Sequence, residues 1–359
     1  KNVAVSKKIF GKDANIYCGS FLEDGWKRAF GIDKFDVIVG NPPFQKKNRE
    51  TEKSQSIWHK FVEKSVCLLK ENGYLIMVHP NGWRNIKGNF KNIFNLFQER
   101  NLQYLTMRTF KDGEKIFNSK TNYDFYCLKN TITNINKTKI NDIDRNQIEI
   151  NLNSFKFIPS GRFNIFKKLL TENQKVDILY SSNNYETRLE RSTYPTNKEK
   201  TKKYIYPVVN SITQKDGIKL IWTSTKNDMF IPKVIWSNGA GTYPIVDKDG
   251  KYGLSQFSYG IKDEVENLEK IKNAMNDPNF IDLMKYVAFT ENKYNYKIIN
   301  IFKKDFWKEF NYKSKTKTKK NTRGGKRKKK IHTKKKMRSL TLPPKTRKRS
   351  KSRTNNKST

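Results

Sequence analysis

The segment that most constrains the fold is residues 36–44, which read D-V-I-V-G-N-P-P-F. Residues 35–39 are apolar enough to predict a strand buried on both faces, as in the middle of a parallel sheet. Pro42 and Pro43 follow, and each fixes its backbone φ and lacks an N–H. The loop after the strand is therefore stiff, and its carbonyls are left free as acceptors. Ligands of doubly wound sheets bind where strands end, so this loop predicts a binding site.

Strand-like and helix-like patterns alternate around this segment, from residue 14 to about 130. The predicted strands are residues 14–18, 35–39, 74–78, 103–107 and 123–128. Apolar residues at helical spacing predict helices at 55–70 and 90–100. This alternation is typical of an α/β fold with a mostly parallel, doubly wound sheet and helices on both faces.

Beyond residue 130 the pattern changes to short strands with fewer helices. Strands are predicted at 148–152, 219–222 and 233–236, with a hairpin at Asp249-Gly250, and helices at 163–170 and 265–275. Aromatic residues here are interleaved with Lys and Arg. We therefore expect a first domain at residues 1–135, a second, mixed α+β domain at 136–312, and a tail at 313–359.

Charge points to a polyanionic partner. The chain holds 74 Lys and Arg against 34 Asp and Glu, a formal net charge of +40. Residues 313–359 contain 22 Lys or Arg and no acidic residue, which leaves the first 312 residues near +18. Polyanions bind such surfaces through phosphate neutralisation and counterion release; a solvated, self-repelling surface is the alternative. The tail has almost no apolar residues, so we expect it to be disordered, like a nuclear-localisation or general nucleic-acid-binding arm.

Several classes of protein are disfavoured by what the sequence lacks. Its three cysteines have no C-x-x-C spacing, and we predict no metal site. No apolar run approaches the roughly 18 residues of a membrane span, and no signal-peptide pattern opens the chain. We therefore expect an intracellular protein, cytoplasmic or nuclear, without a membrane partner.

The loop Asn41-Pro42-Pro43-Phe44, placed after such a strand, resembles the motif of amino-methyltransferases that use S-adenosylmethionine. Among them the chain is similar to the Eco57I/TaqI-like adenine-N6 DNA methyltransferases of type II restriction-modification systems. The resemblance implies a Rossmann-like sheet and site-specific methyl transfer to N6 of an adenine flipped out of double-stranded DNA. It also implies that the Asn41 side chain and the Pro42 carbonyl accept the amino hydrogens while Phe44 stacks on the base. A rigid turn without a substrate is the structural alternative.

Three further segments are similar to the family in the same order along the chain. Residues 15–23 (NIYCGSFLE) look like its cofactor segment, which implies that Gly19, Ser20 and Phe21, with Asn41, contact S-adenosylmethionine. Ser20 stands where the family often has an acidic residue. Residues 73–84 (GYLIMVHPNGWR) look like its next strand and loop.

The third segment, residues 121–128 (TNYDFYCL), looks like the strand whose aromatic residues wall the target-base pocket, which implicates Tyr123 and Phe125. After the motif, Lys46, Lys47 and Arg49 are candidates for contact with DNA phosphates. A solvated basic loop is an equal alternative for these three. In this family the segment 155–312 would be the target-recognition region.

The family's glycine-rich cofactor loop would precede Lys1. We therefore expect an upstream segment or a second subunit to complete the cofactor site. The sequence S-N-G-A-G at 237–241 is a candidate for a circularly permuted loop. Such a loop must open a helix, and Thr242-Tyr243-Pro244 cannot start one, so a turn is expected there.

Other functions stay open from the sequence. The chain is alternatively a non-catalytic DNA-binding fragment of a decayed or split methylase. Methyltransferases acting on RNA guanine or protein glutamine share the loop, but they more usually carry Tyr at its fourth position and lack a large basic second domain. A nuclease fused upstream is a further alternative. No paired-carboxylate nuclease pattern stands out, so no cleavage is predicted.

Overall fold

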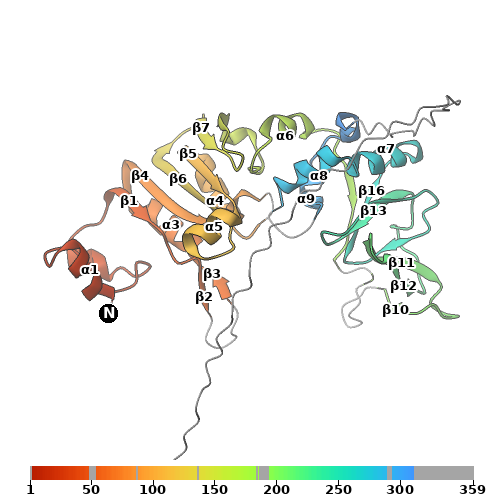
Figure 1. The fold of residues 1–359 in the computed structure, drawn as a ribbon, viewed down its shortest axis with the longest axis horizontal. Helices are drawn as coiled ribbons and strands as arrows, with labels where there is room; N and C mark the ends of the chain where they lie inside the picture. The colour runs from red at the N-terminus through yellow and green to blue at the C-terminus, as the bar shows by residue number, and fades with distance from the viewer. Residues whose placement is uncertain are drawn as a thin grey trace, which may run out of the picture. The chain divides into compact units, whose positions relative to one another are not determined.

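A computed structural model describes residues 2–47, 54–85, 88–135, 137–182, 185, 194–288 and 293–310. The chain divides into two units, Lys1–Lys313 and Ser314–Thr359. The second unit, which contains almost all of the predicted basic tail, lies outside the described residues. The first unit contains a six-stranded sheet, two four-stranded sheets and a two-stranded sheet (Figure 1).

The six-stranded sheet has the order β1-β4-β6-β5-β7-β8. Its strands are β1 (Phe35–Gly40), β4 (Leu69–Pro80), β5 (Arg100–Arg108), β6 (Tyr123–Ile132), β7 (Lys137–Asn141) and β8 (Gln147–Asn151). Strand pairs β1–β4 and β5–β7 are parallel, whereas β4–β6, β5–β6 and β7–β8 are antiparallel. The sheet is therefore mixed rather than mostly parallel, because β6 runs back between β4 and β5. It also extends to Asn151, beyond the expected domain boundary at residue 135.

One face of this sheet is covered by α3 (Trp58–Leu68) and α4 (Lys91–Glu99), as the helical patterns predict. Their apolar stripes, such as Val62 and Phe97, pack on buried side chains of β4 and β5 in a single core. On the other face, Tyr104 is 52% exposed and Phe125 39% exposed. In the described part of the chain, a helix reaches this second face only at the start of β6, where Phe117 of α5 (Phe110–Phe117) meets Tyr123, and the rest of the face around Tyr104 and Phe125 stays open.

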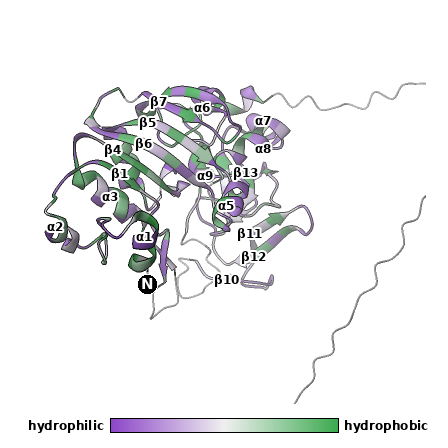
Figure 2. Cartoon of the chain, turned by 60° about the vertical axis from the view of Figure 1, so that its left-hand side comes forward, coloured by the Kyte–Doolittle hydropathy of each residue, from purple (hydrophilic) through white to green (hydrophobic). Residues whose placement is uncertain are grey.

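Among the residues that the structure describes, strand β1 lies at an edge of the sheet and pairs only with β4. Figure 2 shows β7, β5, β6, β4 and β1 in that order. Val37 is 52% exposed and Val39 is 71% exposed, so the prediction of a strand buried on both faces is wrong. The strand predicted at 14–18 is also wrong: these residues form no strand, and they follow α1 (Asn2–Phe10) as irregular chain before α2 (Gly25–Phe30).

The remaining two sheets belong to the segment after Asn151. One has the order β14-β13-β16-β9, with β14 (Ile245–Asp247), β13 (Lys233–Ser237), β16 (Ser258–Lys262) and β9 (Asp177–Leu179). The other has the order β10-β12-β11-β15, with β10 (Thr196–Asn197), β12 (Gly217–Thr223), β11 (Tyr206–Thr213) and β15 (Gly253–Leu254). The accompanying helices are α6 (Phe163–Leu169), α7 (Val265–Met275), α8 (Pro278–Lys285) and α9 (Tyr296–Ile299).

Strand β13 shows how these layers stack, because neighbouring side chains on a strand point to opposite faces. Val234 and Trp236 belong to the core that contains Leu268 of α7, whereas Ile235 belongs to the core that contains Val209 of β11. The β13 sheet therefore lies between α7 on one side and the β11 sheet on the other.

Most of the elements predicted in this segment are confirmed. Strands at 219–222 and 233–236 correspond to β12 and β13, and helices at 163–170 and 265–275 to α6 and α7. The strand at 148–152 is β8, although it joins the six-stranded sheet. The Asp249-Gly250 hairpin is wrong: Gly250 does turn the chain with φ +63°, but β14 and β15 on its two sides join different sheets.

Two broader expectations concern membranes and metals. Within the described ranges, no helix has both the length and the apolar composition to span a membrane. The same residues contain no group of three or more His, Cys, Asp or Glu arranged to hold a metal ion.

Candidate functional site

The site is built around the loop that follows β1. Pro42 is buried, Phe44 is half-buried, and Asn41 and Pro43 are exposed. The Phe44 carbonyl accepts hydrogen bonds from Ile57 N (3.2 Å) and Ser56 Oγ (3.4 Å), which ties the loop to the start of α3. Neither the Asn41 side chain nor the Pro42 carbonyl has a hydrogen-bond partner among the described residues. The loop is thus held rigidly while two acceptor groups stay free for a ligand.

Aromatic rings connect this loop to β6. Phe44 meets Phe117 edge to face, with ring centroids 6.3 Å apart, and Phe117 meets Tyr123 in the same way at 5.0 Å. Tyr123 is buried, and Phe125 shares its face of β6, because residues two apart on a strand point the same way. The guanidinium of Arg108 lies 5.5 Å from the Phe125 ring. The structure therefore brings Phe44 and Tyr123 together through a residue that the sequence interpretation missed.

Phe117 ends α5 (Phe110–Phe117), a helix that the sequence patterns did not predict. A local pattern could have revealed it. Thr109 accepts from the backbone of Asp112, and the Asp112 carboxylate accepts from the Thr109 backbone, which is a capping box. An acidic residue three positions after a threonine marks the start of such a helix.

His79 lies behind the loop, at the end of β4, and is fully buried. It stacks on Trp58 with ring centroids 4.0 Å apart, and its Nδ1 lies 3.0 Å from the Pro80 carbonyl. Burial lowers the pKa of His79 to about 4. The imidazole is therefore neutral at physiological pH and acts as part of the packing under the loop rather than as a cation.

A buried ion pair fixes the base of β6. Arg84 Nε lies 3.0 Å from Asp124 Oδ2, which also accepts from Trp83 Nε1 at 2.9 Å, and all three side chains are buried. Burial raises the pKa of Asp124 to about 6, against the opposing effect of Arg84. Arg84 also donates to Ser160 Oγ at 3.1 Å. Through Arg84, the start of β6, which carries Tyr123 and Phe125, is linked to Ser160 in the chain that follows the six-stranded sheet.

The predicted cofactor residues lie in the irregular segment before α2, where Gly19 and Ser20 are exposed. The Tyr17 ring occupies the space beside Gly19 where a Cβ would stand. The Phe21 ring stacks with Trp26 at 6.3 Å and with Phe61 at 5.8 Å. Because the chain's own aromatic rings occupy these places, the described residues as arranged do not form a cradle for S-adenosylmethionine.

The predicted phosphate contacts start on a short strand pair, β2 (Gln45–Lys47) with β3 (Ser54–Ser56). Lys46 is exposed there, and Lys47 ends β2. Arg49 lies outside the described residues. The candidate glycine loop at 237–241 is the turn between the antiparallel strands β13 and β14, as the plainer interpretation expects.

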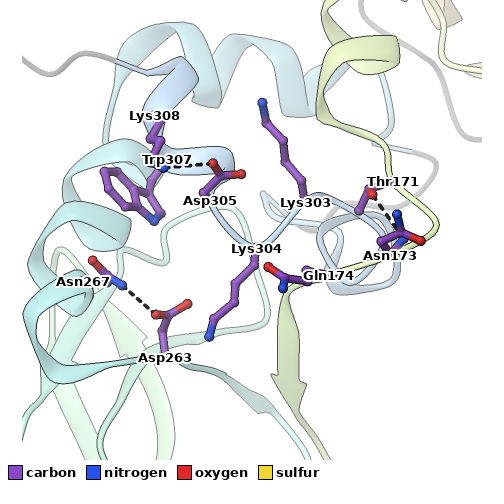
Figure 3. Close-up of a pocket in the computed structure, with 10 residues that line it drawn as sticks. All are labelled: Thr171, Asn173, Gln174, Asp263, Asn267, Lys303, Lys304, Asp305, Trp307 and Lys308. Atoms are coloured by element: carbon purple, nitrogen blue, oxygen red, sulfur yellow. Dashed lines mark hydrogen bonds and ion pairs between the residues drawn. The ribbon is translucent and has the colours of Figure 1, made fainter.

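A cavity of about 610 Å³ lies elsewhere, between the chain around Gln174 and the C-terminal helical turn η4 (Phe306–Glu309) (Figure 3). None of the residues predicted for catalysis or cofactor binding lines it. Two of its lysines are already neutralised, since Lys308 pairs with Asp305 at 3.1 Å and Lys303 with Glu309 at 2.7 Å. The residues predicted for catalysis lie in the loop after β1 and not in this cavity.

The geometry defines an α/β protein with hydrogen-bond acceptors and an aromatic wall at the end of a strand. Residues 6–117, which include the loop and α5, match the model of the Eco57I restriction-modification methylases. This part of the chain is therefore similar to the Eco57I restriction-modification methylases, and the match does not extend beyond residue 117. The chain is also 41% identical over 64 residues to an uncharacterized adenine-specific methylase of Mycoplasma pneumoniae. That match covers 17% of this chain and 15% of the relative.

Solved structures overlap with the chain only in part. The type IIL restriction-modification enzyme MmeI, determined in complex with DNA, matches with a TM-score of 0.41 and 9% identity over 72% of this chain and 45% of that one. A nuclease-deletion mutant of the type ISP enzyme LlaGI, determined with a DNA substrate mimic, matches with a TM-score of 0.39 and 11% identity over 73% and 40%. The chain spans less than half the length of each.

Proposed function

We propose that this chain is the catalytic and DNA-recognising part of a site-specific adenine-N6 DNA methyltransferase of a restriction-modification system. The observation that carries the proposal is the pair of free acceptors at Asn41 and Pro42, inside a segment of the methylase family. Residues 1–135 would hold the catalytic, Rossmann-like part, and 136–312 the target-recognition region. The tail at 313–359 would add sequence-independent affinity for DNA.

The free acceptors suit an exocyclic amino group. An adenine N6 amino group has two N–H donors, and the Asn41 Oδ1 and Pro42 carbonyl are two acceptors on adjacent residues. Hydrogen bonds to both would draw the nitrogen's lone pair out of conjugation with the ring and make the nitrogen a better nucleophile. S-adenosylmethionine is the proposed methyl donor.

The ring system beside the acceptors suits a flipped base. Phe44 and Tyr123 would stack on the adenine, each contact worth about 1–3 kcal/mol. Extruding a base from the duplex costs a few kcal/mol, so stacking and capture of the amino group together can offset that cost. Phe117 now lies between Phe44 and Tyr123, so the base would have to displace it or stack against it.

We also propose that a further segment or a second subunit completes the cofactor site by pairing with β1. Support comes from the free edge of β1 and from Val37 and Val39, which are apolar and more than half exposed. An exposed apolar edge strand is a template for strand addition. Binding there would let the proposed contacts Gly19, Ser20 and Phe21 rearrange away from their present aromatic neighbours.

The test is a transfer assay with radiolabelled S-adenosylmethionine and DNA that lacks adenine methylation. The chain would be assayed alone and as the intact protein of its gene, and digested nucleosides identified by mass spectrometry. N6-methyladenine is the expected product. Normal DNA binding without any product from either preparation would instead support the non-catalytic alternative, which the closed arrangement around Gly19 and Phe21 favours. Label in RNA or in protein glutamine would support the remaining alternatives.

A further inference from the structure

Charge is unevenly distributed over the layers that follow Asn151. Residues 194–226, which include β10, β11 and β12, contain seven lysines and two acidic residues. Residues 263–288, which include α7 and α8, contain three lysines and six acidic residues. Because the β13 sheet separates α7 from the β11 sheet, the basic and acidic layers lie on opposite sides of it. A polyanion would therefore approach from the side of the β11 sheet.

The lysines of the basic layer gather at one end of that sheet. Thr223, the last residue of β12, pairs with Thr196 of β10 on one side and with Tyr206 of β11 on the other. The connection from β10 to β11 therefore crosses near the end of β12. It carries four lysines, and one more follows β12. These five exposed residues, here named the lysine rim, are Lys198, Lys200, Lys202, Lys203 and Lys226.

Half-buried aromatic rings support three members of the lysine rim. The ammonium group of Lys200 lies 5.4 Å from the Trp222 ring, that of Lys203 lies 5.7 Å from Tyr204, and that of Lys226 lies 5.1 Å from Tyr206. Such contacts order the long side chains but leave their positive charge in place. The rim therefore presents partly pre-ordered cations.

Two of the three lysines of the acidic layer form ion pairs, whereas Lys270 lies 5.0 Å from the Trp307 ring. Lys272 pairs with Glu269 at 2.5 Å and Lys285 with Asp282 at 3.1 Å. By contrast, no lysine of the rim forms an ion pair with a carboxylate of the described residues. A lysine without an internal carboxylate keeps its own counterions, and these are released when it meets a phosphate.

We infer that the lysine rim is the surface that binds the phosphate backbone of double-stranded DNA, with Trp222, Tyr204 and Tyr206 holding its side chains in place. This inference rests on the proposed function for the choice of DNA as the partner. It assigns the phosphate contacts to one end of the β11 sheet, and it excludes the α7–α8 side of the molecule.

The test measures how salt affects the binding of the full chain to a labelled duplex of mixed sequence, about 30 base pairs long, between 50 and 200 mM salt. The triple variant Lys200→Gln, Lys203→Gln, Lys226→Gln is compared with a charge-matched control, Lys167→Gln, Lys168→Gln, Lys262→Gln, whose exposed lysines lie on α6 and β16. Each lost phosphate contact lowers the slope of log K against log salt by about 0.9. We expect the magnitude of this slope to fall by about 2–3 in the rim variant and to stay at the wild-type value in the control. Both variants should keep the wild-type melting temperature.

Each other outcome has a separate meaning. A wild-type slope in the rim variant, or an equal loss in the control, would overturn the inference, because position would then not matter. Tighter binding of duplex RNA with the same dependence on the rim would overturn the choice of DNA. A wild-type chain that binds no DNA at any salt would overturn both this inference and the proposed function. A slope loss with no methyl transfer by the intact protein would refute the proposed function alone.

Discussion

Strands β1 and β13 are both short apolar strands, yet they have opposite surroundings. All five residues of β13 are buried, because β14 and β16 pair with its two edges and cores cover its two faces. Strand β1 pairs on one edge only within the described part of the chain, and Val39 is 71% exposed. The segment that contains β13 thus completes its own packing. Strand β1, which precedes the loop Asn41-Pro42-Pro43-Phe44, has one edge unpaired by the described residues, where a further strand could pair.

The largest effect should come from the loop itself. Replacing Asn41 by Ala removes one of the two acceptors proposed for the adenine amino group, so we expect the rate of methyl transfer to fall roughly 10²–10³-fold. DNA affinity should change less than about twofold, because the lysine rim and the tail lie outside the loop. Asn41→Asp keeps an acceptor oxygen and should retain more activity than Asn41→Ala. Equal losses in binding and transfer would mean that the two functions are not separated in this way.

Stability measurements can test the contrast between the strands directly. Ile235→Ala in β13 removes a fully buried side chain and should lower the free energy of unfolding by about 2–5 kcal/mol. Val39→Ala in β1 should cost less than about 0.5 kcal/mol in the same chain. Denaturant unfolding would measure both. A similar cost at the two positions would show that the Val39 side chain is covered, and the comparison would fail.

His79 lies on the face of the six-stranded sheet that α3 and α4 cover. Its protonation tests whether that face is closed to water, as the surroundings of β13 are. Its folded pKa of about 4 lies below the ordinary value of 6.5, so the unfolded chain takes up a proton first as pH falls. Its contribution to stability is complete above pH 6.5 and is lost between pH 6.5 and 4, by roughly 3 kcal/mol. As pH falls from 6.5 to 4, the free energy of unfolding of His79→Phe should therefore rise relative to that of the wild type. The buried Asp124 has the opposite dependence, but it is present in both proteins and cancels from the difference. A pH-independent difference would mean that His79 is accessible to water.

The smallest effect is expected at Phe117. Phe117→Ala removes one wall of the ring system, and we expect kcat/KM for methyl transfer to fall about tenfold, as for the loss of one stacking contact. Phe110→Ala on the same helix is the control, because Phe110 is 46% exposed and has no ring contact with Phe44 or Tyr123. If Phe117→Ala instead raised kcat/KM, Phe117 would be an obstacle to the base rather than part of its pocket.

Local patterns predicted much of the structure. The strands around residues 74–78, 103–107 and 123–128, and the helices α3, α4 and α7, follow from hydrophobic periodicity, which neighbouring residues alone determine. The loop Asn41-Pro42-Pro43-Phe44 was also recognisable, because the two prolines impose their geometry without help from the rest of the fold. The resemblance to the Eco57I restriction-modification methylases is confirmed by the match over residues 6–117.

Other features depend on contacts between distant residues, and only the tertiary structure decided them. The direction of β6, the open edge of β1, and the position of Phe117 between Phe44 and Tyr123 each require knowing which strands become neighbours. The same holds for the lysine rim, whose members become significant once β10 and β11 pair with the same end of β12. The sequence of a largely apolar strand such as β1 shows only that the strand can be buried. Whether it is buried depends on what packs beside it, because burial is a property of the neighbours and not of the strand.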